Sequence, residues 1–210
     1  MMTVVPAINE VSFEELLKKI EIAREFKAPF IKFDIADGDF SSVKTWSDSS
    51  LLASLPTDLF YEIHFMWRET DSFFEEWLKK PVTRFIFHIE TTKNPLIIKE
   101  RCEALKIVPV LAMVFDSDWA LIEPYIVKFN AFQVLAVVPG KSHQKFDERA
   151  LKLIANLRKI KPSATIEVDG GVNEISAPLF VEAGADMLAS TSFIFDSINP
   201  IASYKKLLNI

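Results

Sequence analysis

Residues 165–189 read TIEVDGGVNEISAPLFVEAGADMLA, and this stretch decides the fold class. A short β-branched run, Thr165–Val168, is followed by a helical pattern over Ser176–Ala183 and then by a second apolar run, Met187–Ala189. A strand, a helix and a second strand in this order are typical of a βαβ unit, whose two strands lie parallel in one sheet.

The same alternation continues over the whole chain. Eight apolar runs are predicted to be strands, namely Thr3–Ile8, Phe30–Ile35, Leu59–Met66, Thr83–Ile89, Ile107–Phe115, Ala131–Val138, Thr165–Val168 and Met187–Ala189. The amphipathic segments between them are predicted to be helices, namely Ser12–Glu25, Asp71–Lys79, Pro95–Ala104, Asp118–Val127, Phe146–Lys159, Ser176–Ala183 and Pro200–Leu208, with a weaker pattern over Ser50–Leu55. Ser12 and Glu15 have the spacing of a capping box, which predicts the start of the first helix.

Eight such units favour an α/β fold, a closed (β/α)₈ TIM barrel that forms a single domain over residues 1–210. The alternative is an open, doubly wound sheet. Such a sheet often carries a GxGxxG motif after its first strand, and no such motif follows Thr3–Ile8.

Composition and charge exclude several classes of protein. The 24 basic and 29 acidic residues give a net charge of −5, which argues against nucleic-acid binding through bulk positive charge. A single cysteine, Cys102, excludes a disulfide framework and a Cys-rich zinc site. No apolar run approaches the roughly 20 residues of a membrane span, and Met1–Ser12 lacks the basic flank of a signal peptide. We therefore expect a soluble, cytoplasmic protein with no membrane or nucleic-acid partner.

Polar residues cluster at the predicted carboxyl ends of the strands, where barrels carry their active sites. Asp34 and Asp169 each interrupt an apolar run, which is costly unless the acid has a partner or a function. Lys32 lies two residues before Asp34, so both side chains are expected on the same face of their strand. If that face points inward, the two residues form a site, and an outward face would leave them no part in one. The alternative for Asp34 alone is a buried ion pair with Lys32.

These strand ends resemble the ribulose-phosphate 3-epimerase family. The resemblance rests on Asp34-Ile35-Ala36-Asp37-Gly38, His64-Phe65-Met66, Pro139-Gly140, Ile166-Glu167-Val168-Asp169-Gly170-Gly171-Val172, and Ala183-Gly184-Ala185-Asp186 followed by Ser192 and Phe195. The run from Glu167 to Val172 is the most specific signal, and the likeness extends from Pro6 to the last helix. It implies an isomerase of carbohydrate metabolism that interconverts ribulose 5-phosphate and xylulose 5-phosphate, in the pentose phosphate reactions. The family is often oligomeric, which leaves a homo-oligomer open.

The resemblance also implies roles for individual residues. Asp34 would be the general base and Asp169 the general acid at C3, with the roles exchanging between directions. A divalent zinc, iron or manganese ion would be held by Asp34, His64 and Asp169 together with a histidine at the position of Lys32. A lysine ammonium has no lone pair and repels a metal cation. A metal-free site in which Lys32 supplies the positive charge is therefore the alternative.

The residues expected to bind the sugar phosphate are Lys32, Met66, Gly140, Lys141, Gly170, Gly171, Thr191 and Ser192. The phosphate loop departs from the family pattern Gly–Phe–Gly–Gly, because it reads Gly140-Lys141-Ser142-His143. His88 is expected to hydrogen-bond a neighbouring site residue, and His143 to be a loop residue only. Two alternatives to the epimerase remain open. One is a diverged or inactive barrel that binds another sugar phosphate without catalysis. The other is decarboxylase or synthase chemistry, whose Asp–x–Lys–x–x–Asp order differs from Lys32-x-Asp34-x-x-Asp37.

Overall fold

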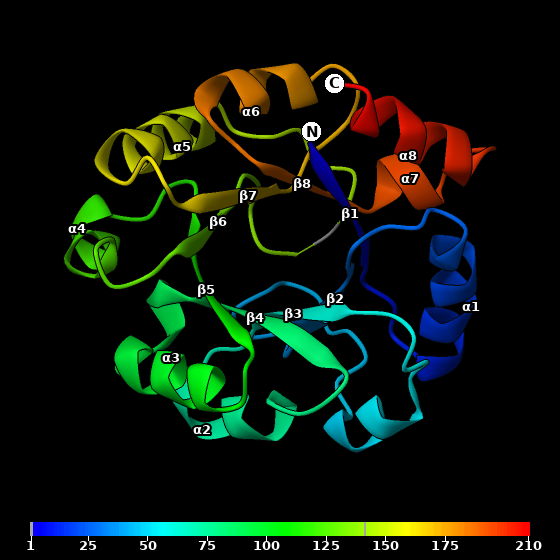
Figure 1. Ribbon diagram of the computed structural model, residues 1–210, viewed down its shortest axis with the longest axis horizontal. Coiled ribbons are helices and arrows are strands. Elements are labelled where there is room, and N and C mark those ends of the chain that lie inside the picture. Colours follow the sequence, from blue (N-terminus) through cyan, green and yellow to red (C-terminus); the bar gives the residue numbers. More distant parts are fainter. Residues whose placement is uncertain (1, 141) are drawn as a thin grey trace.

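Eight parallel strands close into a barrel in the computed structural model, which describes residues 2–140 and 142–210 (Figure 1). The strands are β1 (Thr3–Ile8), β2 (Ile31–Ala36), β3 (Tyr61–Met66), β4 (Val82–His88), β5 (Val108–Val114), β6 (Ala131–Leu135), β7 (Thr165–Asp169) and β8 (Met187–Ser190). They follow one another around the barrel in sequence order, and β8 pairs with β1 to close it. The predicted barrel is confirmed, with strand ends that differ from the predicted ones by at most three residues.

Helices surround the barrel in Figure 1. They are α1 (Phe13–Arg24), α2 (Thr70–Phe73), α3 (Pro95–Ala104), α4 (Trp119–Ile122), α5 (Arg149–Ile160), α6 (Ala177–Ala183), α7 (Ser192–Phe195) and α8 (Pro200–Leu208). Short 3₁₀ turns lie at Ser49–Ser54, Phe74–Trp77, Ile89–Thr91 and Glu123–Tyr125. Ser12 accepts a hydrogen bond from the Glu15 backbone N–H, so the predicted N-cap is confirmed.

Two predicted helices are shorter than expected. Asp118–Val127 forms an α-helix only over Trp119–Ile122 and continues as a 3₁₀ turn. Pro124 has no backbone N–H to donate to an i−4 carbonyl, which ends the α-helical pattern there. The predicted helix Asp71–Lys79 is likewise divided, into the α-helix Thr70–Phe73 and the 3₁₀ turn Phe74–Trp77. The four-residue helix α7 was not predicted.

The main hydrophobic core lies between the strands and the helices. Outward-facing side chains such as Phe33, Phe65 and Phe87 are fully buried there, against helix residues that include Leu16 and Ile98. Burial of such side chains stabilises the fold by about 1.5–3 kcal/mol each. This layer fixes the alternation of each strand, and so it also fixes which residues point into the barrel.

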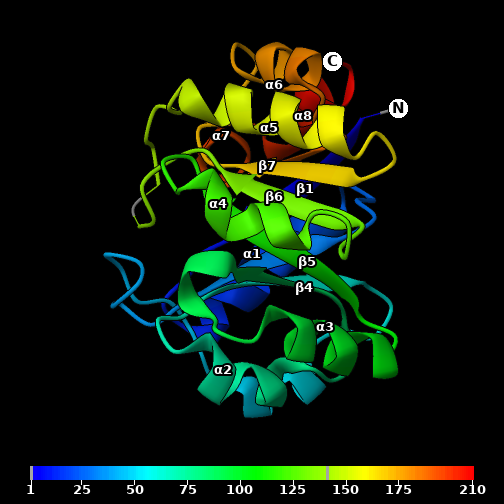
Figure 2. The same ribbon diagram turned by 90° about the vertical axis from the view of Figure 1, so that its left-hand side faces the viewer.

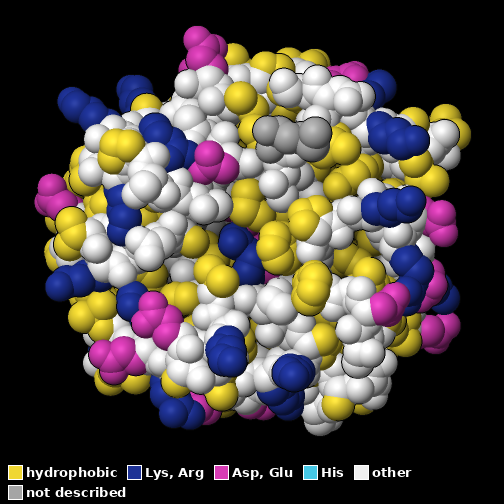
Figure 3. Space-filling view, viewed as in Figure 1, with side chains coloured by type: hydrophobic (Ala, Val, Ile, Leu, Met, Phe, Trp, Pro, Cys, Tyr) yellow, Lys and Arg dark blue, Asp and Glu magenta, His cyan; other side chains and the backbone are white. Residues whose placement is uncertain are grey.

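The inside of the barrel is polar to an unusual degree. Lys32, Glu62, Arg84, Gln133 and Glu167 contact one another across it, and each is buried. Figure 3 shows Lys or Arg atoms at the centre of one end of the barrel, surrounded by hydrophobic side chains. Contacts of Lys32 with Asp169 and of Asp34 with His64 place both residues on the inward face of β2.

Loops after β2 and β6 extend from the same end of the barrel, on the left in Figure 2. The Ser42 backbone N–H donates to the Pro139 carbonyl at 3.3 Å, which joins the two loops. Among the described residues, no helix is long and apolar enough to cross a membrane.

Candidate active site

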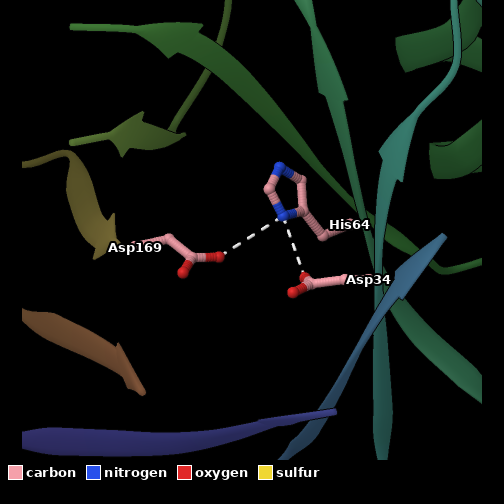
Figure 4. A group of neighbouring side chains, drawn as sticks. All are labelled: Asp34, His64 and Asp169. Atoms are coloured by element: carbon pink, nitrogen blue, oxygen red, sulfur yellow. Dashed lines mark hydrogen bonds and ion pairs between the residues drawn. The ribbon is translucent and has the colours of Figure 1, made fainter. Parts of the chain in front are cut away.

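Asp34, His64 and Asp169 come together at the carboxyl end of the barrel, from strands β2, β3 and β7 (Figure 4). Nδ1 of His64 lies 3.1 Å from Oδ1 of Asp34 and 3.3 Å from Oδ2 of Asp169. The three side chains offer one possible ligand atom each, and these atoms all lie within 4.8 Å of one another. The structure thus brings together three residues that the sequence placed at three separate strand ends.

Lys32 lies beneath this triad and has no exposed surface. Its ammonium nitrogen is 3.0 Å from Oδ2 of Asp169 and 2.5 Å from Oε1 of Gln133, and it also donates to Oε1 of Glu167. Burial disfavours the charged form, but Asp169 and Glu167 raise the pKa of Lys32 above its ordinary value. Lys32 is therefore a fixed positive charge within the barrel.

A second ion pair lies next to Lys32. Nε of Arg84 donates to Glu62 at 2.7 Å, and Nη2 of Arg84 donates to Glu167 at 3.1 Å. Burial, followed by repulsion from Glu167, raises the pKa of Glu62 to about 7. Two cations and two glutamates therefore form one buried cluster, and Lys32 connects this cluster to Asp169.

Lys32 makes the two aspartates electrostatically different. Burial opposes ionisation of Asp169, but Lys32 and His64 hold the pKa of Asp169 below its usual range. For Asp34, burial and the nearby Asp169 raise the pKa above its usual range. The pKa values of the two carboxyl groups are therefore pushed apart, which suits a pair in which one group takes up a proton and the other gives one up.

His64 also contacts two side chains through Nε2. That nitrogen lies 2.9 Å from Nε2 of His88 and 2.9 Å from Nε2 of Gln133. Nδ1 of His88 lies 3.2 Å from Oε2 of Glu90, and Glu90 accepts from the Val114 backbone N–H at 2.8 Å. The expected hydrogen bond between His88 and a site residue is therefore present.

A cavity of about 440 Å³ opens above the triad, which is large enough for a small phosphorylated metabolite. Asp34, His64 and Asp169 line it together with six of the expected substrate-binding residues, Met66, Gly140, Gly170, Gly171, Thr191 and Ser192. Lys141 lies outside the described residues. Lys32 is not on the described lining but below Asp169, which differs from the expectation that it contacts the substrate.

The loop after β6 closes one side of the cavity. Nδ2 of Asn9 donates to Oγ of Ser142 at 2.8 Å, which connects the end of β1 to this loop. Gly140 has a φ angle of 148°, which strains other residues, and a Cβ atom there would lie 2.2 Å from Oγ of Ser42 and would displace that hydroxyl. His143 lies in this loop, as predicted, where it lines the cavity and its Nε2 lies 3.1 Å from Oδ2 of Asp196.

Sequence reasoning missed Glu62, Arg84 and Gln133. Each lies on the inward face of its strand, and Gln133 pairs in register with Glu167, as Leu135 does with Asp169. The available signal was spacing, because Glu62 precedes His64 by two residues and Gln133 precedes Leu135 by two.

Comparisons with known proteins agree with this geometry. The model of the ribulose-phosphate 3 epimerase family matches residues 3–195. A ribulose-phosphate 3-epimerase of Chlamydia pneumoniae is 32% identical over 91% of this chain and 85% of its own length. Another from Methanocaldococcus jannaschii is 30% identical over 99% of this chain and 90% of its own length. Among solved structures, 3-keto-L-gulonate-6-phosphate decarboxylase from Vibrio cholerae superposes with a TM-score of 0.74 over 99% of this chain and 95% of that one. Because the two sequences are only 6% identical, this superposition shows the barrel fold alone.

Proposed function

The chain belongs to the ribulose-phosphate 3-epimerase family, and from this premise we propose that it interconverts ribulose 5-phosphate and xylulose 5-phosphate by exchanging the proton on C3. The observation that carries the proposal is the convergence of Asp34 and Asp169 from β2 and β7 at the floor of one cavity. Inversion of a carbon requires one group to take a proton and another to return a proton to the opposite face. Two carboxylates from two strands supply that pair.

His64 and the aspartates act together in this mechanism. One aspartate removes the C3 proton and the other delivers a proton, and the roles exchange between the two directions. Negative charge then develops on an oxygen of the enediolate. Nδ1 of His64 lies beside both carboxylates, so an N–H at this position is placed to donate to that oxygen.

Glycines and hydroxyl groups that line the cavity after the last strands suit the phosphate. Gly140, Gly171, Thr191 and Ser192 line this region, which follows strands β6, β7 and β8. Phosphate sites in barrels commonly form after the last strands. Backbone N–H groups and hydroxyls would therefore hold the phosphate, while the sugar carbons lie over Asp34 and Asp169.

The divalent metal that the family implies does not fit the residues present. Asp34, His64 and Asp169 offer three ligand atoms, but the fourth position is occupied by Lys32, whose ammonium can only donate. This ammonium already binds Oδ2 of Asp169 at 3.0 Å, so the same carboxylate would hold a metal and an ammonium together. A cation on that carboxylate would be repelled by the Lys32 ammonium. We therefore assign no catalytic step to a metal.

Proton exchange tests the proposal directly. Ribulose 5-phosphate is incubated with the protein in D₂O, and the C3 proton signal is followed by NMR. We expect the wild-type protein to remove the signal, and Asp34→Asn and Asp169→Asn to slow its loss by about 10²–10⁴-fold. Asp58→Asn, the same change at a surface ion pair with Arg24, is the matched control.

Failure of exchange in the wild-type protein, with and without added Zn²⁺ or Mn²⁺, would contradict the proposal. Calorimetry with ribulose 5-phosphate would then distinguish a barrel that binds a sugar phosphate without catalysis from one that takes another ligand.

A further inference from the structure

We propose that Lys32 and Gln133 together set the hydrogen-bonding direction of His64, so that Nδ1 of His64 carries a proton and acts as a donor instead of a metal ligand. The inference rests on the site of the proposed epimerase activity and deepens it. It makes Lys32 and Gln133 positioning residues that act through His64. Its basis is the direction of three buried hydrogen bonds.

The first hydrogen bond fixes the orientation of the Gln133 amide. A lysine ammonium has three N–H donors and no acceptor. Lys32 finds one oxygen for each donor, on Gln133, Glu167 and Asp169. Since an ammonium cannot accept, the atom of Gln133 that lies 2.5 Å from it must be the amide oxygen. The amide NH₂ group of Gln133 therefore faces the other way.

The second hydrogen bond fixes Nε2 of His64. The Gln133 amide nitrogen lies 2.9 Å from this ring nitrogen, and an amide nitrogen donates but does not accept. A proton on Nε2 would therefore oppose the amide hydrogens at that distance. A lone pair on Nε2 accepts from the Gln133 amide. Nε2 of His88 also lies at 2.9 Å, and it donates to this lone pair only when the His88 ring carries a proton on Nε2. Nδ1 of His88 lies 3.2 Å from Oε2 of Glu90, so that arrangement requires a second proton on the pair of His88 and Glu90.

The third hydrogen bond follows from the first two. If Nε2 of His64 holds the lone pair, the ring proton is on Nδ1. This nitrogen faces the carboxylate oxygens of Asp34 and Asp169 at 3.1 and 3.3 Å, and both oxygens can accept. The contacts of the buried ring with Gln133, Asp34 and Asp169 are thus satisfied without an ion.

A metal ligand would need the opposite arrangement. A histidine that binds a metal presents a lone pair to the ion and donates its other ring N–H to an acceptor. At His64 the group fixed beside Nε2 is a donor, the Gln133 amide, and Lys32 holds it in that orientation. Lys32 therefore opposes metal binding twice, by its own charge at the fourth position and through the tautomer of His64.

Nitrogen NMR tests the tautomer directly. The chain has three histidines, so protein labelled with ¹⁵N-histidine gives three rings, and His143→Asn and His88→Gln identify two of them. We expect the His64 ring to show a protonated Nδ1 and an Nε2 that bears a lone pair, in protein prepared with a chelator. A proton on Nε2 of His64 would overturn the inference. The spectrum is recorded with Gln133 in place, so the test holds even if variants at Gln133 do not fold.

Gln133→Glu replaces the amide donor beside Nε2 of His64 with a carboxylate acceptor. The new carboxylate can accept from Lys32 with one oxygen and from an Nε2–H of His64 with the other. We expect this variant to move the His64 proton to Nε2 and to bind Zn²⁺ about 10–100-fold more tightly than the wild-type protein. Gln144→Glu adds the same charge at the cavity lining, and we expect it to leave the ring signals of His64 unchanged. Equal gains in Zn²⁺ affinity for both variants, or stoichiometric Zn²⁺ on His64 of the wild-type protein, would overturn the inference.

These readouts need no turnover. If the wild-type protein shows the expected nitrogen spectrum but does not exchange the C3 proton, the epimerase proposal is wrong and the tautomer assignment stands. If it exchanges the C3 proton but carries a proton on Nε2 of His64, the tautomer assignment is wrong and the epimerase proposal stands.

Discussion

Nζ of Lys32 lies 3.0 Å from Oδ2 of Asp169, and the same oxygen lies 3.3 Å from Nδ1 of His64. One carboxylate oxygen thus joins the buried ion cluster to the group that faces the cavity. The cluster is not only structural, because Lys32 lowers the pKa of Asp169 and orients Gln133 against His64. Substitutions within the buried cluster should therefore alter the pKa values and hydrogen bonds of the residues that line the cavity.

Removal of Lys32 should destabilise the fold. Lys32→Met leaves Glu167 and Asp169 buried without their closest cation, and loss of one partner of a buried ion pair costs about 3–5 kcal/mol. Urea unfolding at pH 7 measures this loss.

A double-mutant cycle with Glu167→Gln tests the origin of the loss. Lys32→Met with Glu167→Gln should lose less stability than the sum of the two single changes, because no charge at position 167 is left unpaired. Strict additivity would show that Lys32 and Glu167 do not stabilise each other.

Gly171→Ala should damage the site more than Gly38→Ala. Both glycines have positive φ angles, 68° and 90°, so alanine is strained at either position. A Cβ atom on Gly171 would lie 2.6 Å from the Phe146 backbone nitrogen, whereas one on Gly38 would lie 3.7 Å from the Lys44 side chain. We expect Gly38→Ala to cost about 1–2 kcal/mol. Gly171→Ala should cost more and also raise KM, because Phe146 follows the loop that lines the cavity. Equal effects on stability and KM would argue against the clash.

The sequence predicted the barrel because its signals are local. Each apolar run predicts one strand, and each amphipathic segment predicts one helix. Few folds other than the barrel contain eight such strand–helix repeats. The same local signals failed where one residue changes the backbone, as Pro124 does after α4. The short α7 escaped prediction because Ser192–Phe195 spans barely one turn and has no period to detect.

The triad was predictable and its surroundings were not. Asp34, His64 and Asp169 stand at strand ends in recognisable motifs, so their meeting follows from the barrel. Gln133 lies within a strand, and its meaning depends on Lys32 across the barrel, 101 residues away in sequence. The direction of a hydrogen bond between residues so far apart in sequence depends on the packed interior. Sequence spacing alone does not predict it.

The hydrogen bond between Asn9 and Ser142 should order the loop after β6. Asn9→Ala and Ser142→Ala each remove this bond. We expect either change to raise KM several-fold with a smaller effect on kcat, because both residues line the cavity but do not contact the proposed acid and base. Steady-state kinetics in both directions check this. If the bond is responsible, the double variant should be no worse than the more affected single variant. Multiplicative effects would mean that each residue contacts the substrate separately.

Cys102 should make stability depend on alkaline pH. Burial, followed by the nearby Glu75 and Glu103, raises the pKa of this thiol from its ordinary value to about 12. Because the unfolded chain ionises its thiol first, it releases a proton that the folded chain keeps, and the free energy of unfolding falls as pH rises from about 9 towards 12. Unfolding in urea at pH 7.5 and pH 10 should show a decrease about 1 kcal/mol larger for the wild-type protein than for Cys102→Ala. The comparison cancels the titration of lysines and tyrosines, which both proteins share. The same decrease in both proteins would show that the Cys102 thiol ionises as readily in the fold as in the unfolded chain.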